Sequence, residues 1–315
     1  MSIFKLFFFL VILTVLPSIS AQDENTPDPD TAAEQTAPPA EQSTESSDEG
    51  DSSKKVIFNR SKVEIAPPIA LDKQQKDDLE HYLPENEIEQ LLAGEEQFIS
   101  LKQASKTRNS KGVVVFIPDW QQTPVSPKAI NFLRNALPTK GWVTIAMQPP
   151  LKPIDYPSLL EDNAARIEAN KQALQTYQAD LTTKLQAVMD KTKNYPGIIL
   201  LITQGNNAGI LFNLYQQNKL PSPTALIMLS AHMLTKEDNQ QFAANMAKSS
   251  FPVFDLLLTK DHPQVASSAN LRKIAVDKEM KIFYRQRVIS NQTPSYYPQK
   301  TLLKEIDSWL KSVGW

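Results

Sequence analysis

The segments GVVVFIP at 112–118 and GIILLIT at 197–203 decide the fold, because each is a continuous run of apolar, largely β-branched residues. Such runs are typical of strands that are covered on both faces. Two further segments, ALIMLSA at 225–231 and PVFDLLLT at 252–259, have the same character. We therefore expect four central strands of a buried sheet.

Two flanking strands and six helices complete the pattern. The strands are WVTIAMQPP at 142–150 and KIFYRQRVI at 281–289, and the helices are expected at 126–141, 157–193, 208–217, 236–248, 264–275 and 301–313. In the first helix Ile130, Leu133 and Leu137 recur every three or four residues, which places them on one face. Alternating strands and helices require right-handed crossovers. The expected fold class is α/β, a doubly wound, mostly parallel sheet.

The chain before residue 112 is less regular. KVIFNRSKVEIA at 55–66 alternates weakly and fits an edge strand or a hairpin. LPENEIEQLLAGEEQFISLKQ at 83–103 is expected to be helical, because Ile88, Leu91 and Leu92 form a short apolar face. We expect a single α/β domain over residues 54–315.

The N-terminus has the pattern of a secretory signal peptide over residues 1–21. Lys5 precedes an apolar run from Leu6 to Leu16, and Pro17 and small residues follow it, so cleavage is expected after Ser20 or Ala21. The alternative, a retained membrane anchor, needs roughly 20 apolar residues, and this run has about half of that. No later segment has the length of a span, so the mature protein is expected to lack one.

Residues 22–53 form an acidic segment that contains ten Asp and Glu and no Lys or Arg. Its remaining residues are mostly Ser, Thr, Pro, Ala and Gln, a composition typical of disordered linkers. Because the whole chain carries a net charge of −2, the rest of it is basic. A solubilising spacer is the favoured interpretation, and docking of this segment on the domain is the alternative. The cations are scattered, so no nucleic-acid partner is expected.

The chain contains no cysteine. Thiol catalysis, thiolate metal sites and redox exchange are therefore excluded. A domain of this length can bury enough apolar surface to fold without disulfides.

The third expected strand runs into LITQGNNAGI at 201–210. Gly205 and Gly209 lie in this turn, and a sharp strand-to-helix turn needs a residue that avoids steric clash. Ligands in open α/β sheets bind at the carboxyl edge of the strands, where such turns lie. We expect the side chains that carry chemistry to gather at this edge. They are Asp119, Trp120, Gln204, Asn206, Asn207, Ser230, His232, Asp261 and His262.

The order of elements resembles the last six strands of the α/β-hydrolase fold. GVVVFIPDWQQ at 112–122, LRNALPTKGWVTIAMQPP at 133–150, the Gln204-Gly205 turn and FYRQR at 283–287 are similar to a bacterial family of exported, hydrolase-like proteins that is known only as a domain of unknown function. The resemblance spans residues 54–315 and is strongest from 112 to 210. It implies a fold and, for the compartment, a bacterial periplasm.

The resemblance also locates a catalytic triad, of which two members are missing here. The elbow after the third strand places Gly205 at the nucleophile position, and sliding the alignment places Asn206 or Asn207 there. None of these side chains can attack a carbonyl. Asp261 matches the place of the family's acid, but SNQTPSYYPQK at 290–300 contains no histidine.

A rearranged site remains open as an alternative. It would use Ser230, His232 or His262 with Asp261, although adjacent Asp261 and His262 side chains usually diverge. The simpler interpretation is that each histidine is a loop residue that faces solvent or bonds locally.

No cofactor or metal ion is expected. The histidines lack the spacing of a ligand set, and the Gly205–Gly209 turn lacks the Lys-Ser/Thr of a P-loop and the GxGxxG pattern. A small anion at this helix N-terminus is the remaining possibility.

Two functions stay open. The favoured one is a non-catalytic binding or scaffolding protein, a pseudoenzyme whose partner is a cell-envelope ligand or a protein. The alternative is a serine-type ester or acyl hydrolase that acts on cell-envelope components or small esters through the rearranged site. This alternative rests on analogy of fold alone.

Overall fold

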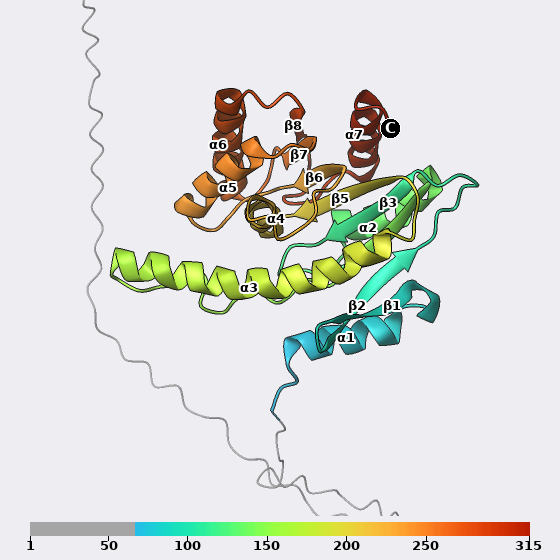
Figure 1. The fold of residues 1–315 in the computed structure, drawn as a ribbon, viewed down its shortest axis with the longest axis horizontal. Coiled ribbons are helices and arrows are strands. Elements are labelled where there is room, and N and C mark those ends of the chain that lie inside the picture. Colours follow the sequence, from blue (N-terminus) through green and yellow to red (C-terminus); the bar gives the residue numbers. More distant parts are fainter. Residues whose placement is uncertain (1–66) are drawn as a thin grey trace, which may run out of the picture. The chain divides into compact units, whose positions relative to one another are not determined.

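The computed structural model describes residues 67–315, which form an eight-stranded sheet covered by helices on both faces (Figure 1). The strands are β1 (Ile88–Ala93), β2 (Glu96–Gln103), β3 (Gly112–Ile117), β4 (Trp142–Met147), β5 (Ile198–Gln204), β6 (Ala225–Leu229), β7 (Val253–Leu258) and β8 (Tyr284–Ile289). Their order in the sheet is β1-β2-β4-β3-β5-β6-β7-β8. All neighbours from β4 to β8 are parallel, whereas β1 and β2 are antiparallel. The expected α/β class is confirmed.

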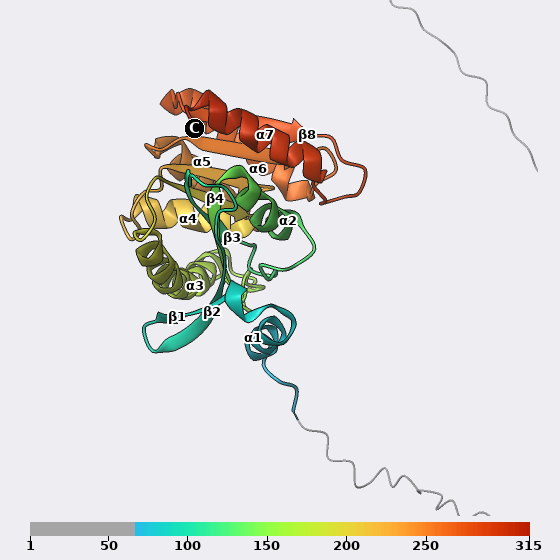
Figure 2. The same cartoon turned by 90° about the vertical axis from the view of Figure 1, so that its right-hand side faces the viewer.

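Seven α-helices surround this sheet within the described part of the chain. They are α1 (Leu71–Tyr82), α2 (Ala129–Ala136), α3 (Asn163–Thr192), α4 (Asn206–Gln216), α5 (Lys236–Lys248), α6 (Pro263–Glu279) and α7 (Gln299–Ser312). Figure 2 shows α1 and the β1–β2 hairpin at one end of the sheet, and β8 with α7 at the other. Between residues 67 and 315, no helix combines the length and the apolar character needed to cross a bilayer.

Two apolar cores lie on the two faces of the sheet. One core packs side chains of α3, α4 and α5 against β3 residues such as Val113 and Val115. The other packs α2 and α7 against Val114 and Phe116 of the same strand. Successive side chains of a strand point to opposite faces, so the continuous apolar run of β3 supplies both cores.

The helix expected at 83–103 is wrong. This segment forms a short 3-10 turn (Glu85–Glu87) and then the antiparallel hairpin of β1 and β2. Leu91 and Ala93 are buried while Leu92 is exposed, which is the period of two that a strand requires. Gly94 forms the turn with φ of 65°, a left-handed value that a glycine adopts without steric cost.

Two other features differ from the expectation, and the predictions for residues before 67 are not tested. The long helix begins at Asn163, where Asp162 caps it by accepting a hydrogen bond from the Ala165 amide, and not near residue 157. Helix α1 had no counterpart in the sequence analysis. The segment at 55–66, the signal sequence at 1–21 and the acidic segment at 22–53 lie outside the described residues, so these assignments stay predictions.

A buried ion pair connects the core to the loop after β6. Asp255 of β7 accepts hydrogen bonds from Nε of Arg272 at 2.8 Å and from Nη2 at 3.1 Å, and both side chains are fully buried. Nη1 of Arg272 donates to the Ala231 carbonyl at 2.9 Å. Arg272 therefore holds the backbone between Ser230 and His232, two candidate site residues.

Replacing Asp255 with Asn is expected to lower the free energy of unfolding by about 3–5 kcal/mol, because it leaves the Arg272 guanidinium buried without a counter-charge. Urea denaturation measures the change. The matched control is Lys171→Gln, which removes the exposed Lys171–Glu168 pair and should change stability by less than about 1 kcal/mol. Equal effects of the two substitutions would contradict a structural role for the buried pair.

Candidate functional site

The connection from β5 to α4 is a single residue, Gly205. Its φ of 60° and ψ of −131° lie in a region that residues with a side chain adopt only under strain. The turn has the strand-to-helix geometry of a nucleophile elbow, in which the nucleophile occupies this connecting position. The structure therefore has the elbow, with a glycine where a serine would be required for attack.

The carboxylate of Asp119 occupies the space beside Gly205. A Cβ atom built on Gly205 would lie 2.5 Å from Cγ of Asp119 and 2.7 Å from each carboxylate oxygen. Oδ1 of Asp119 accepts hydrogen bonds from the Asn206 amide at 3.0 Å and from Nδ2 of Asn206 at 3.3 Å. The backbone N–H after the nucleophile is the donor that an elbow offers to an oxyanion. Here a carboxylate of the chain itself uses that donor.

Burial perturbs the two titratable groups nearest the elbow. It raises the pKa of Asp119, against the opposing effects of the Asn206 hydrogen bonds and the His232 ring. Burial also lowers the pKa of His232, which favours the neutral imidazole. Nδ1 of His232 lies 3.0 Å from the Ser230 carbonyl, which can only accept, so Nδ1 carries the proton and Nε2 is an acceptor.

The Ser230 hydroxyl forms its hydrogen bonds with Asp261 and Tyr297 and with neither imidazole. Its hydroxyl donates to Oδ2 of Asp261 at 2.6 Å and lies 2.8 Å from the hydroxyl oxygen of Tyr297. The rings of His232 and His262 stack with their centroids 4.9 Å apart. Within residues 67–315 no side-chain hydroxyl hydrogen-bonds to either ring. The relay of hydroxyl, imidazole and carboxylate that a triad needs is not formed.

These groups line one cavity of about 430 Å³ at the carboxyl edge of the sheet. Of the residues that the sequence singled out, it contains Asp119, Trp120, Gln204, Gly205, Asn206, Ser230, His232, Asp261 and His262. The remaining two, Asn207 and Gly209, lie outside it.

Asn207 and Gly209, in the first turn of α4, pack α4 against neighbouring segments. Asn207 donates from Nδ2 to the Pro118 carbonyl at 2.6 Å and accepts from the Tyr177 hydroxyl at 2.8 Å. It thereby ties α4 to the loop that carries Asp119. A Cβ on Gly209 would lie 2.5 Å from the sulfur of Met233, so the glycine lets Met233 pack closely against α4.

Sequence reasoning missed Tyr297, Lys128 and Lys152. Tyr297 reaches Ser230 from the loop after β8, which is the place where hydrolases carry their histidine. Burial raises the pKa of Tyr297 well above its usual value, so this phenol stays neutral. Lys128 and Lys152 line the cavity from the segments after β3 and β4. The Tyr-Tyr pair in the histidine-free loop was the one signal that could have indicated Tyr297.

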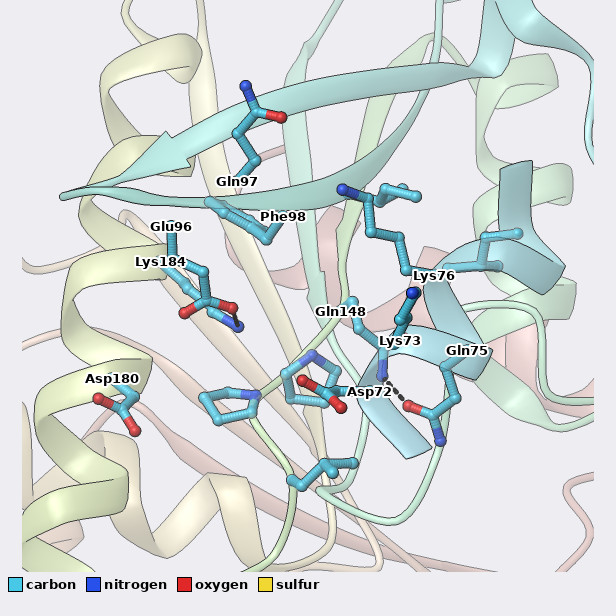
Figure 3. A pocket seen from close by; sticks show the side chains of 15 residues that line it. Asp72, Lys73, Gln75, Lys76, Glu96, Gln97, Phe98, Gln148, Asp180 and Lys184 are labelled. Atoms are coloured by element: carbon cyan, nitrogen blue, oxygen red, sulfur yellow. Dashed lines mark hydrogen bonds and ion pairs between the residues drawn. The ribbon is translucent and has the colours of Figure 1, made fainter. Parts of the chain in front are cut away.

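A second cavity of about 490 Å³ lies between α1, β2, α3 and the segment after β4 (Figure 3). Lys184 and Glu96 pair there at 3.0 Å, and Nε2 of Gln148 donates to Gln75 at 2.9 Å. No hydroxyl or imidazole lines this cavity. Its lining therefore has no pair of hydroxyl and imidazole of the kind that a serine hydrolase uses.

A protein-family model matches nearly the whole chain and establishes its family. The family described as "Protein of unknown function" (DUF3530) matches residues 4–312. The chain belongs to this family. No functionally curated protein is detectably similar in sequence. The suspected kinship with a family of unknown function is therefore confirmed.

Several solved structures share the fold of this DUF3530 member. Est1E from Butyrivibrio proteoclasticus has a TM-score of 0.51 at 11% identity, with 71% of this chain and 98% of that chain covered. A candidate dienelactone hydrolase from Klebsiella pneumoniae has a TM-score of 0.50 at 13% identity, with the same shares covered. The carboxylesterase Cest-2923 from Lactobacillus plantarum has a TM-score of 0.50 at 11% identity, covering 72% and 98%. At these identities the likeness establishes the α/β-hydrolase fold and no activity.

Replacing Gly205 with Ala is expected to cost about 1–3 kcal/mol of stability, since it combines backbone strain with a clash on Asp119. Adding Asp119→Ala should recover the steric part, giving a coupling energy above about 0.5 kcal/mol in a double-mutant cycle. The control is Gly94→Ala, which also has a positive φ, of 65°, but lies in open space, so it adds backbone strain without a clash. Additive effects at Gly205 and Asp119 would contradict the contact.

The raised pKa of Asp119 predicts a pH dependence of stability. Because the folded state binds the proton of Asp119 more tightly than the unfolded state, its stabilising contribution is present below the ordinary pKa of 3.8 and is lost as pH rises through the folded pKa. Asp119→Asn should therefore gain stability relative to the wild type between pH 4 and pH 7. Urea denaturation of both proteins across this range gives the difference, and a difference that is independent of pH would contradict the shift.

Proposed function

We propose that this protein is a non-catalytic binding protein that uses the cavity at the carboxyl edge of a hydrolase-like sheet as its ligand site. The observation that carries this proposal is the elbow itself. Gly205 offers no nucleophile, and the Asp119 carboxylate fills the adjoining space and uses the Asn206 amide. A negative group at that position opposes the negative charge that develops on a carbonyl oxygen during acyl transfer.

The geometry around Ser230 supports the same proposal. A serine becomes a nucleophile when an imidazole takes its proton. Ser230 instead donates its proton to the Asp261 carboxylate, and the nearest ring, His232, bonds to the Ser230 backbone carbonyl. Both groups are engaged in local hydrogen bonds that position the loop after β6.

A serine-type ester hydrolase is the second candidate. It is favoured by one observation, the short 2.6 Å contact between Ser230 and Asp261 in a cavity that also holds two imidazoles. This candidate requires the Ser230 hydroxyl to leave Asp261 and to bond to an imidazole nitrogen, which would then act as its base. Esters or acyl groups of the cell envelope would then be the substrates.

Export to a bacterial periplasm is part of the proposal. Its support is the order of Lys5, the apolar run from Leu6 to Leu16 and the small residues that follow, all of which lie outside the described residues. A binding protein in that compartment would meet cell-envelope ligands or protein partners.

A serine-reactive fluorophosphonate probe and a panel of chromogenic esters test the proposal. The purified protein is expected to remain unlabelled and to show no turnover above buffer, because no hydroxyl is activated by a base. A competent serine esterase serves as the positive control, and Ser230→Ala serves as the matched variant. Labelling or turnover that disappears in Ser230→Ala would establish the hydrolase instead.

A further inference from the structure

The cavity contains a partly buried carboxylate, Asp119, that forms no ion pair within residues 67–315. Asp261 forms none within these residues either. Both Asn206 donors meet Oδ1 of Asp119, and no side chain of residues 67–315 donates to Oδ2. Burial lowers the pKa of the adjacent His232, which disfavours the imidazolium form as a counter-charge for Asp119. Desolvation raises the pKa of Asp119, and a cationic ligand would offset that cost by pairing with the charged form.

Two amide oxygens beside it are also without a partner. Gln204 and Asn206 line the cavity, are only 6% and 2% exposed, and have Oε1 and Oδ1 buried with no hydrogen bond in the described part of the chain. The orientation of Asn206 is set by its Nδ2, which donates to Asp119. Unpartnered buried polar atoms are rare in folded proteins and point to a group that completes them.

All of these groups are hydrogen-bond acceptors. They comprise the Asp119 carboxylate, two amide oxygens and Nε2 of His232. A primary ammonium group has three donors, no acceptor and a positive charge, so it complements this set in both charge and hydrogen bonding. A metal ion is less suited, because no three His, Asp or Glu side chains gather in a ligand geometry among residues 67–315.

We propose that the cavity binds a small ligand through a primary ammonium group seated against Asp119, Gln204 and Asn206. This inference rests on the proposed binding function. Lys128 and Lys152 line the same cavity and form no ion pair in the described residues, so they can receive an anionic group of the ligand. An amino acid or a short peptide, with an ammonium and a carboxylate, has this pair of charges. The volume of about 430 Å³ suits a ligand of that size.

The test uses L-alanyl-L-alanine, its N-acetyl derivative and its C-terminal amide, with binding followed by calorimetry or by amide chemical shifts in NMR spectra. The free dipeptide and its amide are expected to bind, because both keep the ammonium group. The N-acetyl derivative should bind at least about tenfold more weakly, since it loses the charge that Asp119 complements. Failure of the dipeptide to bind, or equal binding of the N-acetyl derivative, would overturn the inference.

Variants assign the contacts. Asp119→Asn keeps the size of the side chain and removes its charge, and it should weaken dipeptide binding at least about tenfold. Gln204→Met removes an acceptor at similar volume and should weaken it less. The matched control Lys152→Gln should weaken the dipeptide but leave its amide unchanged. Circular dichroism confirms that each variant is folded, and undiminished binding in both Asp119→Asn and Gln204→Met would overturn the assignment.

The outcomes separate this inference from the proposed function. Turnover of esters by the wild-type protein would end the non-catalytic proposal whatever the dipeptides do. Loss of ammonium selectivity in a protein that still fails to hydrolyse esters would end only the assignment of the ligand.

Discussion

The contact between the Asp119 carboxylate and the first turn of α4 organises the site. Oδ1 of Asp119 accepts from the Asn206 amide, and the rest of the carboxylate fits only because Gly205 has no Cβ. The contact joins the loop after β3 to the elbow after β5, two neighbouring strands of the sheet. Asn207 makes a parallel link through the Pro118 carbonyl, so the two loops are held together at two points. The loop after β6, with Ser230 and His232, is held separately by Arg272 through the Ala231 carbonyl.

The parallel sheet explains why the sequence predicted so much of the arrangement. Polar residues that end β3, β5, β6 and β7 must meet at one edge, because parallel strands end on the same side. Asp119, Gln204 and His232 were therefore placed together from the order of elements alone. The four central strands were found for a related reason, since burial on both faces leaves an unbroken apolar run.

The sequence did not predict contacts between distant segments, or strands too short to show a clear periodicity of apolar residues. The β1–β2 hairpin has only six paired positions and one buried face, so its Leu91 and Leu92 fit a helical spacing as well as an extended one. Asp119 contacts Gly205, which lies 86 residues further along the chain, and Tyr297 contacts Ser230 across 67 residues. No local pattern encodes such distances, because they are set by how the loops fold back over the sheet.

In this elbow, which lacks a nucleophile, hydrogen-bond acceptors face the cavity where a hydrolase has donors. In a hydrolase the turn collects donors that stabilise an oxyanion. Here the Asn206 amide is used internally, and the groups left over are a carboxylate, two amide oxygens and an imidazole nitrogen, all of which accept. The same turn therefore presents acceptors rather than donors to the cavity. One change at the nucleophile position, to a glycine, makes room for the carboxylate, and the carboxylate then favours a ligand with donors and positive charge.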